Sequence, residues 1–379
     1  MPWTAESLQT SLFDNILPVW MKDFVDLEHG GYHERLDWKG TPLDLGYKRL
    51  YPQCRLTYVS SHASSLGAPT LETAQHGFSF IKKYWNETGW SFKLDSQGNL
   101  LDPRRDLTHT VFILLACGHY YSASKDPIAL WMAKHTLSYV KDNFALEKGY
   151  VEALDANNNK LDEVRRQNPH MHFFEGCLAM YKASGEQEYL TMADELFQLC
   201  NDSFVVDGTL REYFTQDLLP HPTRGHIVEP GHHFEWAWLL LEYNKHKPNE
   251  KAVTLSSTLL EFALTHGVDH KNGGIFDEVD NVGNVVLETK RIWPVTEAIK
   301  ACSSHYRLTK DKSYLNRMQD FLDLLFSEYL DEQTGRWREH LTKDLHLYKD
   351  FMPSTTPYHL FLALSEAIKT LEEIVNQET

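Results

Sequence analysis

The sequence predicts an all-α protein built as an (α/α)6 barrel, in which six inner helices are ringed by six outer helices. Three observations predict it. A glycine-led segment recurs six times along the chain, each repeat has room for two helices, and one of those helices is apolar on nearly every side. Self-similarity at a fixed period indicates a repeat architecture, because each repeat buries its apolar surface against its neighbours.

Each repeat begins with a short segment that starts at a glycine, and these glycines are spaced by about 60 residues. The segments are GYHERLDWKG, GWSFKLDSQG, GYVEALDANN, GTLREYFTQD, GIFDEVDNVG and GRWREHLTKD, starting at Gly31, Gly89, Gly149, Gly208, Gly274 and Gly335. Most alternate apolar and polar residues and then reach a turn rich in Asp, Asn or Gly. This pattern predicts a short strand entering a hairpin.

The two helices of a repeat differ in pattern. The first, seen in HFFEGCLAMY, FEWAWLLLEY and PYHLFLALSEAI, is apolar nearly all round, which predicts burial on all sides. The second, seen in residues 186–200 and 312–326, has its apolar residues on one face and is expected to be half-buried. A closed ring of such pairs predicts one catalytic domain over residues 1–379, and a linear helical solenoid is the alternative.

Composition excludes several classes of function. The net charge of -16 argues against a nucleic-acid partner. The densest apolar run, Val111–Cys117, is far shorter than a membrane span, and the N-terminal segment has no signal-peptide pattern. Five cysteines without a CxxC motif indicate reduced thiols. We therefore expect a soluble, cytoplasmic protein with no membrane partner. The sequence does not indicate an oligomeric state.

Polar residues recur at one position of the repeat. About two dozen residues after the glycine, at the start of an inner helix, stand Arg55, His172, His232, Glu297 and His359. Prolines at or near these positions are typical of helix entries. If the barrel closes, these helix starts surround one mouth, which is the expected site.

Histidine dominates this set. His172 precedes Glu175, and His232 precedes Glu235, by three residues, so each pair shares a helical face. Single buried histidines are usually structural, but three at equivalent positions favour a functional site, because burying several imidazoles is costly. His170 and His233 adjoin the candidates and are candidates to line the same mouth.

Four kinds of site fit these residues. His-x-x-Glu pairs could hold a metal, although HExxH and Cys/His clusters are missing. Two of the glutamates Glu175, Glu235 and Glu297 could hydrolyse a glycosidic bond. A non-catalytic sugar-binding scaffold is the third interpretation. The fourth is proton transfer beside a carbonyl, since histidine can take and return a proton near neutral pH and arginine can stabilise enediolate oxygens.

Several segments together resemble the N-acylglucosamine 2-epimerase family over about residues 10 to 370. They are QCRLTYV, NPHMHFFEG, EPGHHFEWAWLL, RIWPVTEAIKA and TPYHLFLAL, which begin at Gln53, Asn168, Glu229, Arg291 and Thr356. The resemblance implies an (α/α)6 barrel and a sugar isomerase or 2-epimerase that acts on a monosaccharide or small saccharide. NPHMH and the compact length look most like the D-mannose isomerase branch.

The resemblance also implies roles for individual residues. His359 matches the histidine that moves the proton at C2, and His232 matches a second acid/base. The expected substrate-binding residues are Arg55, Asn168, His172, Arg224, Glu235, Trp293 and Glu297. Among them, Arg55 would hold the oxygens at C1 and C2, Trp293 would stack near the sugar ring, and the two glutamates would orient imidazoles or bind hydroxyls.

One segment departs from the family pattern. In DLTHTVF, Thr108 stands where relatives usually have an aromatic residue, so no role is assigned to Asp106 or His109. The resemblance implies no metal and no other cofactor. The predicted reaction is interconversion of D-mannose and D-fructose through a cis-enediolate, with 2-epimerisation as the alternative.

Overall fold

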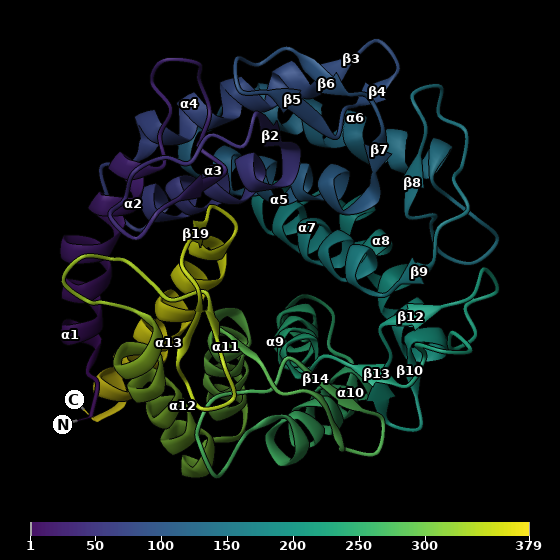
Figure 1. The fold of residues 1–379 in the computed structure, drawn as a ribbon. Coiled ribbons are helices and arrows are strands. Elements are labelled where there is room, and N and C mark those ends of the chain that lie inside the picture. Colours follow the sequence, from purple (N-terminus) through teal and green to yellow (C-terminus); the bar gives the residue numbers. More distant parts are fainter. Residues whose placement is uncertain (1, 379) are drawn as a thin grey trace.

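The computed structural model describes residues 2–378, and its inner helices form a closed ring (Figure 1). These are α3 (Leu50–Ser65), α5 (Leu107–Ser124), α7 (Asn168–Ser184), α9 (Pro230–His246), α11 (Ile292–Thr309) and α13 (Thr356–Glu378). Each inner helix packs on the next, and α13 packs back on α3. The (α/α)6 barrel is confirmed, and the linear solenoid is wrong.

The outer ring has a composite member. Five outer helices follow their inner partners: α4 (Leu71–Ile81), α6 (Pro127–Asn143), α8 (Gln187–Leu199), α10 (Glu250–Phe262) and α12 (Lys312–Leu324). The sixth place is taken by the N-terminal segment, which comprises α1 (Ala5–Gln9), the π-helical η1 (Thr10–Ile16) and α2 (Leu17–Asp23). Helix α1 packs on α13, so the two ends of the chain lie together (Figure 1).

Local sequence explains where the helices begin and end. Pro169 and Pro230 occupy the first turns of α7 and α9, where a missing N–H costs nothing. Asp106 caps α5 by accepting a hydrogen bond from the His109 N–H at 3.0 Å. Four short segments end outer helices: η2 (Lys82–Tyr84), η3 (Cys200–Phe204), η4 (Ala263–Gly267) and η5 (Leu325–Tyr329).

The strands also form a circle, at the end where the inner helices begin. The strand before each inner helix pairs antiparallel with the hairpin of the following repeat. These pairs are β2 (Tyr47–Arg49) with β5 (Lys93–Asp95), β7 (Arg105–Asp106) with β8 (Ala153–Leu154), β9 (Arg165–Arg166) with β12 (Tyr213–Phe214), β13 (Ile227–Val228) with β14 (Glu278–Asp280), β16 (Lys290–Arg291) with β17 (His340–Leu341), and β19 (Met352–Pro353) with β1 (Arg35–Leu36).

The remaining strands extend this circle or close the outer helices. β6 (Leu100–Asp102), β15 (Val285–Leu287) and β18 (Leu347–Lys349) add a third strand to three of the hairpins. Two short pairs, β3 (Trp85–Asn86) with β4 (Gly89–Trp90) and β10 (Val205–Val206) with β11 (Thr209–Leu210), lie just before or at a repeat glycine. In the hairpin turns an aspartate accepts backbone N–H groups, as Asp95 does from Asn99 at 2.8 Å.

An acidic residue near the start of most repeats anchors the entrance of the inner helix. In three repeats it binds the arginine just before or at that entrance: Glu34 with Arg49, Glu152 with Arg166, and Asp277 with Arg291. The carboxylate of Glu152 also accepts the Arg166 backbone N–H at 2.7 Å. Glu212 and Glu339 hold a nearby position in the fourth and sixth repeats, where no arginine precedes the helix. Both residues line the mouth of the barrel, where Glu339 accepts hydrogen bonds from Trp337 and Thr356, and Glu212 from Gln167 and the Glu229 N–H.

The sequence predicted no membrane-spanning helix, and it predicted reduced cysteines. None of the helices within residues 2–378 combines the length and apolar character that crossing a membrane requires. All five cysteines are buried as free thiols between the helices.

Candidate active site

A cavity of about 290 Å³ opens at the N-terminal ends of the inner helices, inside the circle of hairpins. Five inner helices and the hairpin residue Glu212 contribute to its wall. Seven of the nine residues expected to act in the site line it: Arg55, Asn168, His172, His232, Glu235, Trp293 and His359. Glu297 lies directly behind His359, and Arg224 lies outside the lining residues.

His359 is held at both ring nitrogens. Its Nδ1 lies 2.7 Å from Oε1 of Glu297, and its Nε2 lies 3.2 Å from Nη1 of Arg55. A guanidinium can only donate hydrogen bonds, so Nε2 accepts from Arg55 and Nδ1 carries the ring proton. Burial, reinforced by the positive charge of Arg55, lowers the pKa of His359 well below its usual range. The result is a neutral imidazole with a basic nitrogen at the cavity.

Arg55 is fixed from several directions. Its Nη1 also donates to the carbonyl of Thr355 at 3.2 Å, and the guanidinium lies 4.6 Å from the centre of the Phe112 ring and 4.5 Å from that of Tyr358. These contacts order the side chain before any ligand arrives. They also place a permanent positive charge beside Nε2 of His359, where it can stabilise an oxyanion.

His232 has the opposite electrostatic environment. Its Nδ1 lies 2.9 Å from Oε2 of Glu212 and 3.9 Å from Oε2 of Glu229. Burial disfavours the charged ring, but these two carboxylates outweigh it and raise the pKa of His232 to about 9. The carboxamide nitrogen of Asn168 lies 3.0 Å from Nε2, and protonation of Nε2 requires that amide to turn its oxygen toward the ring.

Trp293 lies near both imidazoles. Its ring centroid lies 5.0 Å from that of His232 and 5.6 Å from that of His359. Gly231 makes this possible, because a Cβ there would come within 2.3 Å of Cη2 of Trp293. The glycine of the EPGHH segment is therefore required by the close approach of an aromatic ring from the next inner helix.

The two His-x-x-Glu pairs are used differently. Nδ1 of His172 lies 3.1 Å from Oε2 of Glu175, within its own helix, and burial lowers the pKa of His172 to about 3. The imidazole of His232 instead contacts Glu212, on the hairpin, and Glu235 accepts a hydrogen bond from the Tyr358 hydroxyl at 3.3 Å. The equal spacing in sequence therefore does not give equal contacts.

The two adjoining histidines, His170 and His233, lie away from the cavity, as do Thr108 and His109, to which no role was assigned. Nε2 of His170 accepts the Tyr150 N–H at 3.1 Å, and Nε2 of His233 accepts the Leu210 N–H at 3.2 Å. Neither lines the cavity, because a helix turns about 100° per residue, so that His233 points about 100° away from His232 and His170 about 200° away from His172. His109 is stacked on Phe92, with 4.2 Å between the ring centroids. Half-buried Thr108, beside it on α5, is also absent from the lining.

Arg224 does not line the cavity but contacts a residue that does. Its guanidinium carbon lies 3.4 Å from the centre of the Tyr213 ring, and Tyr213 does line the cavity. Any influence of Arg224 on a bound molecule would therefore pass through Tyr213.

Several lining residues were not expected from the sequence, and Glu212 is the most consequential of them. A signal for it did exist. Glu212 and Glu339 lie one residue further from their repeat glycine than Glu34, Glu152 and Asp277 do, and no arginine stands just before the inner helix of their repeats. An acidic residue kept at an anchoring position without its partner is available for another role.

The same residues could also hold a divalent ion. Three groups place their ligand atoms within 4.8 Å of one another: His172 with Glu175 and Glu235, Glu212 with Glu229 and His232, and Glu235 with Glu297 and His359. In each group the Nδ1 of the histidine already hydrogen-bonds to a carboxylate of that group. An ion there would have to replace these hydrogen bonds.

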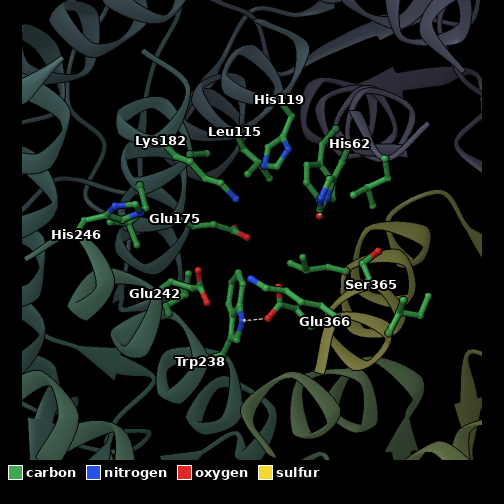
Figure 2. Close-up of a pocket in the computed structure, with 18 of the residues that line it drawn as sticks. His62, Leu115, His119, Glu175, Lys182, Trp238, Glu242, His246, Ser365 and Glu366 are labelled. Atoms are coloured by element: carbon green, nitrogen blue, oxygen red, sulfur yellow. Dashed lines mark hydrogen bonds between the residues drawn. The ribbon is translucent and has the colours of Figure 1, made fainter. Parts of the chain in front are cut away.

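A second, larger cavity of about 400 Å³ lies toward the C-terminal ends of the inner helices. Figure 2 shows His62, His119, Lys182, Trp238 and Glu366 around it. Glu175 lines this cavity too, while its carboxylate bonds to His172 of the first cavity. A layer of buried side chains that includes Glu175 therefore separates the two cavities along the barrel.

Comparison with known proteins points to one family. The N-acylglucosamine 2-epimerase (GlcNAc 2-epimerase) family model matches residues 30–363. A protein of Rhizobium meliloti (strain 1021) named mannose-6-phosphate isomerase is 29% identical, with 96% of each chain covered. A D-mannose isomerase of Thermobifida fusca is 26% identical over 90% of this chain and 89% of its own.

The fold has close counterparts among solved structures. A cellobiose 2-epimerase from Spirochaeta thermophila DSM 6192 superposes with a TM-score of 0.89 at 21% identity, covering 98% of this chain and 97% of that one. This likeness concerns the barrel, whereas the family match spans most of the sequence. The chain therefore belongs to the N-acylglucosamine 2-epimerase family.

Proposed function

We propose that the protein is an aldose–ketose isomerase that interconverts D-mannose and D-fructose through a cis-enediolate intermediate. One observation carries the proposal: a neutral His359 directs a basic nitrogen into the cavity, and the fixed cation of Arg55 lies beside that nitrogen. A base next to an oxyanion-stabilising group is what abstraction of a proton α to a carbonyl needs.

In the proposed reaction, Nε2 of His359 takes the C2 proton of the open-chain aldose. The electron pair of the broken C–H bond forms the C1=C2 double bond, and the former carbonyl oxygen becomes an oxyanion that Arg55 stabilises. Return of the proton to C1, with transfer of the O2 proton to O1, gives the ketose. His232, charged below about pH 9, donates a proton to the ring oxygen as the C1–O5 bond breaks, and the neutral imidazole then takes the proton that the O1 hydroxyl loses as the C1 aldehyde forms.

The remaining lining residues are proposed to bind the sugar. Asn168 and His172 bind hydroxyl groups, Trp293 packs against the sugar carbons between the two imidazoles, and Glu235 binds a hydroxyl or orients the groups around it. The cavity volume of about 290 Å³ is at the lower end for ligand sites, which are roughly 300–1,000 Å³, and suits a monosaccharide.

We propose a free sugar as substrate, although one relative is named mannose-6-phosphate isomerase. The two arginines at the rim are already bound to carboxylates: Arg166 to Glu152, and Arg291 to Asp277 and Glu229. A phosphate would have to compete for them beside further glutamates. We expect kcat/KM for mannose to exceed that for mannose 6-phosphate at least tenfold, and the reverse order would refute this assignment.

A 2-epimerase is the second candidate. His232 and His359 both line the cavity, on different inner helices, and we propose that they reach C2 from different sides. Two such groups are what return of the proton to the opposite face of C2 requires. The likeness to a cellobiose 2-epimerase is compatible with this alternative.

The deciding experiment is NMR of mannose, glucose, N-acetylglucosamine and cellobiose incubated with the protein in D2O. Isomerisation of mannose gives fructose signals and exchange at carbon, whereas epimerisation gives an aldose with altered configuration at C2. No change in any of the four sugars would refute both assignments. The free, buried thiols suit a reducing compartment, and we propose a cytoplasmic location.

A further inference from the structure

Lys300 lies beneath the proposed active site and is completely buried. It is one helical turn after Glu297 on α11, and its Nζ lies 2.6 Å from Oε2 of Glu297. The other oxygen of the same carboxylate binds His359. Burying an ammonium group is costly unless it is paired, so this lysine needs a specific reason to be there.

The surroundings of Lys300 are acidic and aromatic. Three carboxylates from three inner helices act on its charge: Glu297 of α11, Glu235 of α9 and Glu175 of α7. The ammonium also lies 4.3 Å from the Trp238 ring centre and 5.9 Å from that of Tyr358. Lys300 is therefore the cation shared by a buried group of three acids, and it does not line the cavity itself.

The ionisation of Glu297 depends on this cation. Burial raises the pKa of Glu297 well above its usual range, Lys300 is the largest opposing influence, and Glu235 and Glu175 add to the upward shift. Without Lys300 the pKa of Glu297 would lie higher still, which favours the protonated carboxyl. A carboxylic acid that donated this proton to Nδ1 of His359 would force the ring proton onto Nε2 and so remove the basic lone pair from the cavity.

We propose that Lys300 is a positioning residue for the reaction: its ammonium keeps Glu297 ionised, and Glu297 in turn holds His359 in the tautomer whose Nε2 carries no proton. The inference rests on the proposed function only in assigning the base to His359. It differs from a packing role because the effect of Lys300 passes through one carboxylate.

The first test is Lys300→Met, which keeps most of the side-chain volume and removes the charge. We expect kcat to fall roughly 10–100-fold, the size of effect seen when the partner that orients a functional histidine is lost. KM should change less than about threefold, because Lys300 does not contact the cavity. Glu297 would then ionise only at higher pH, so the acid limb of the kcat profile should move up by about one pH unit or more.

A double-mutant cycle separates positioning from packing. In a Glu297→Gln background no carboxylate needs the cation to stay ionised, so adding Lys300→Met should change kcat less than about threefold. An equal fold-loss in both backgrounds would mean that Lys300 acts independently of Glu297, and it would overturn the proposal.

Two further variants guard against a simple loss of folding. Lys48 is also buried, pairs with Asp26 at 2.6 Å and does not line the cavity, so Lys48→Met should lower the melting temperature and leave the pH profile unchanged. Lys300→Arg retains the charge and should keep the acid limb of the wild-type protein even where kcat falls. If the acid limb of the kcat profile moves to higher pH in Lys300→Arg by as much as in Lys300→Met, the proposal is contradicted.

The tautomer of His359 can be read without any turnover. In protein carrying 15N-labelled histidine, the resonances that disappear in His359→Gln belong to this ring. We expect Nδ1 to be protonated in the wild-type protein and Nε2 to become protonated in Lys300→Met. An unchanged tautomer in the folded variant refutes the role of Lys300, whereas inactivity of the wild-type protein toward every sugar refutes only the proposed function.

Discussion

His359 Nδ1 and Glu297 Oε1 lie 2.7 Å apart across the interface of α13 and α11, and this contact fixes which ring nitrogen carries the proton. A carboxylate that accepts from Nδ1 leaves Nε2 unprotonated and turned toward Arg55. The proposed base is thus prepared by a residue that lies outside the cavity lining.

Replacing His359 by alanine should lower kcat by about 10²–10⁴-fold, the usual contribution of a positioned acid or base. Binding of the sugar should persist, because the other lining groups remain, and calorimetric titration can measure it. His305→Gln is the matched control: His305 is buried on the distal half of α11, between the Ala301 carbonyl and Ser256. That variant should lose stability and retain activity. Activity of His359→Ala above a tenth of the wild-type value would refute its role as base.

The charge of His232 predicts an alkaline limit to activity. Because Glu212 and Glu229 raise the pKa of His232 to about 9, the proposed acid is charged below that pH and is lost as the pH rises through it. The kcat/KM profile should therefore fall above about pH 9. Glu212→Gln should move this limb down toward the ordinary histidine value of about 6.5. A limb unaffected by this substitution would show that another group governs it.

The raised pKa of His232 also contributes to the free energy of unfolding. The charged form of His232 is favoured in the folded protein, so its contribution is complete below about pH 6.5, the ordinary value for an unfolded histidine, and is lost as the pH rises through about 9. The difference in unfolding free energy between wild type and His232→Gln should narrow over that interval. Denaturant unfolding at pH 6 and pH 10 measures it, and a constant difference would contradict the ion pair with Glu212.

Gly231→Ala should disturb Trp293 without touching either imidazole. The added Cβ would come within 2.3 Å of the indole, so the ring has to move from its place beside His232 and His359. We expect kcat/KM to fall by up to about 10²-fold, as a displacement of about 1 Å near reacting groups can cause. Gly118→Ala is the matched control, since its Cβ would meet the Ala179 backbone at 2.9 Å, away from the site. It should lower the melting temperature and leave kcat/KM largely intact.

Removal of divalent ions should leave the rate unchanged. The three groups of histidine and glutamate that could hold an ion are already joined by hydrogen bonds between Nδ1 and a carboxylate. The test is activity after exhaustive EDTA treatment and gel filtration. Activity that disappears and returns with one particular divalent ion would revive the metal interpretation.

Much of the barrel was predictable because its signals are local. An inner helix that is apolar all round can only be buried, and six copies at one period require a ring or a solenoid. The sixth outer helix was not predictable in the same way. The repeats begin at Gly31, so the missing partner of α13 precedes the first repeat, and α1 reaches α13 only once the ring closes.

The sequence predicted most of the residues that line the site, but fewer of the contacts between their side chains. Spacing on a helix identifies residues that share a face, and it correctly pairs His172 with Glu175. It also suggests Glu235 for His232, although the actual partner is Glu212, brought from a hairpin by β-pairing. Lys300 gives no sequence signal at all, because a lysine in TEAIKA looks like an exposed helical residue until three inner helices enclose it.

The closure of the ring also determines when the proposed active site can form during synthesis of the protein. Arg55 and His359 are 304 residues apart in the chain, yet their side chains touch. At about 5–20 residues per second, a ribosome needs roughly 15–60 s to travel from the first to the second. During that interval α3 lacks its contact with α13, and the proposed base has not yet been synthesised. Activity should therefore appear only when the last inner helix has left the ribosome, as an all-or-none event rather than in proportion to the length made.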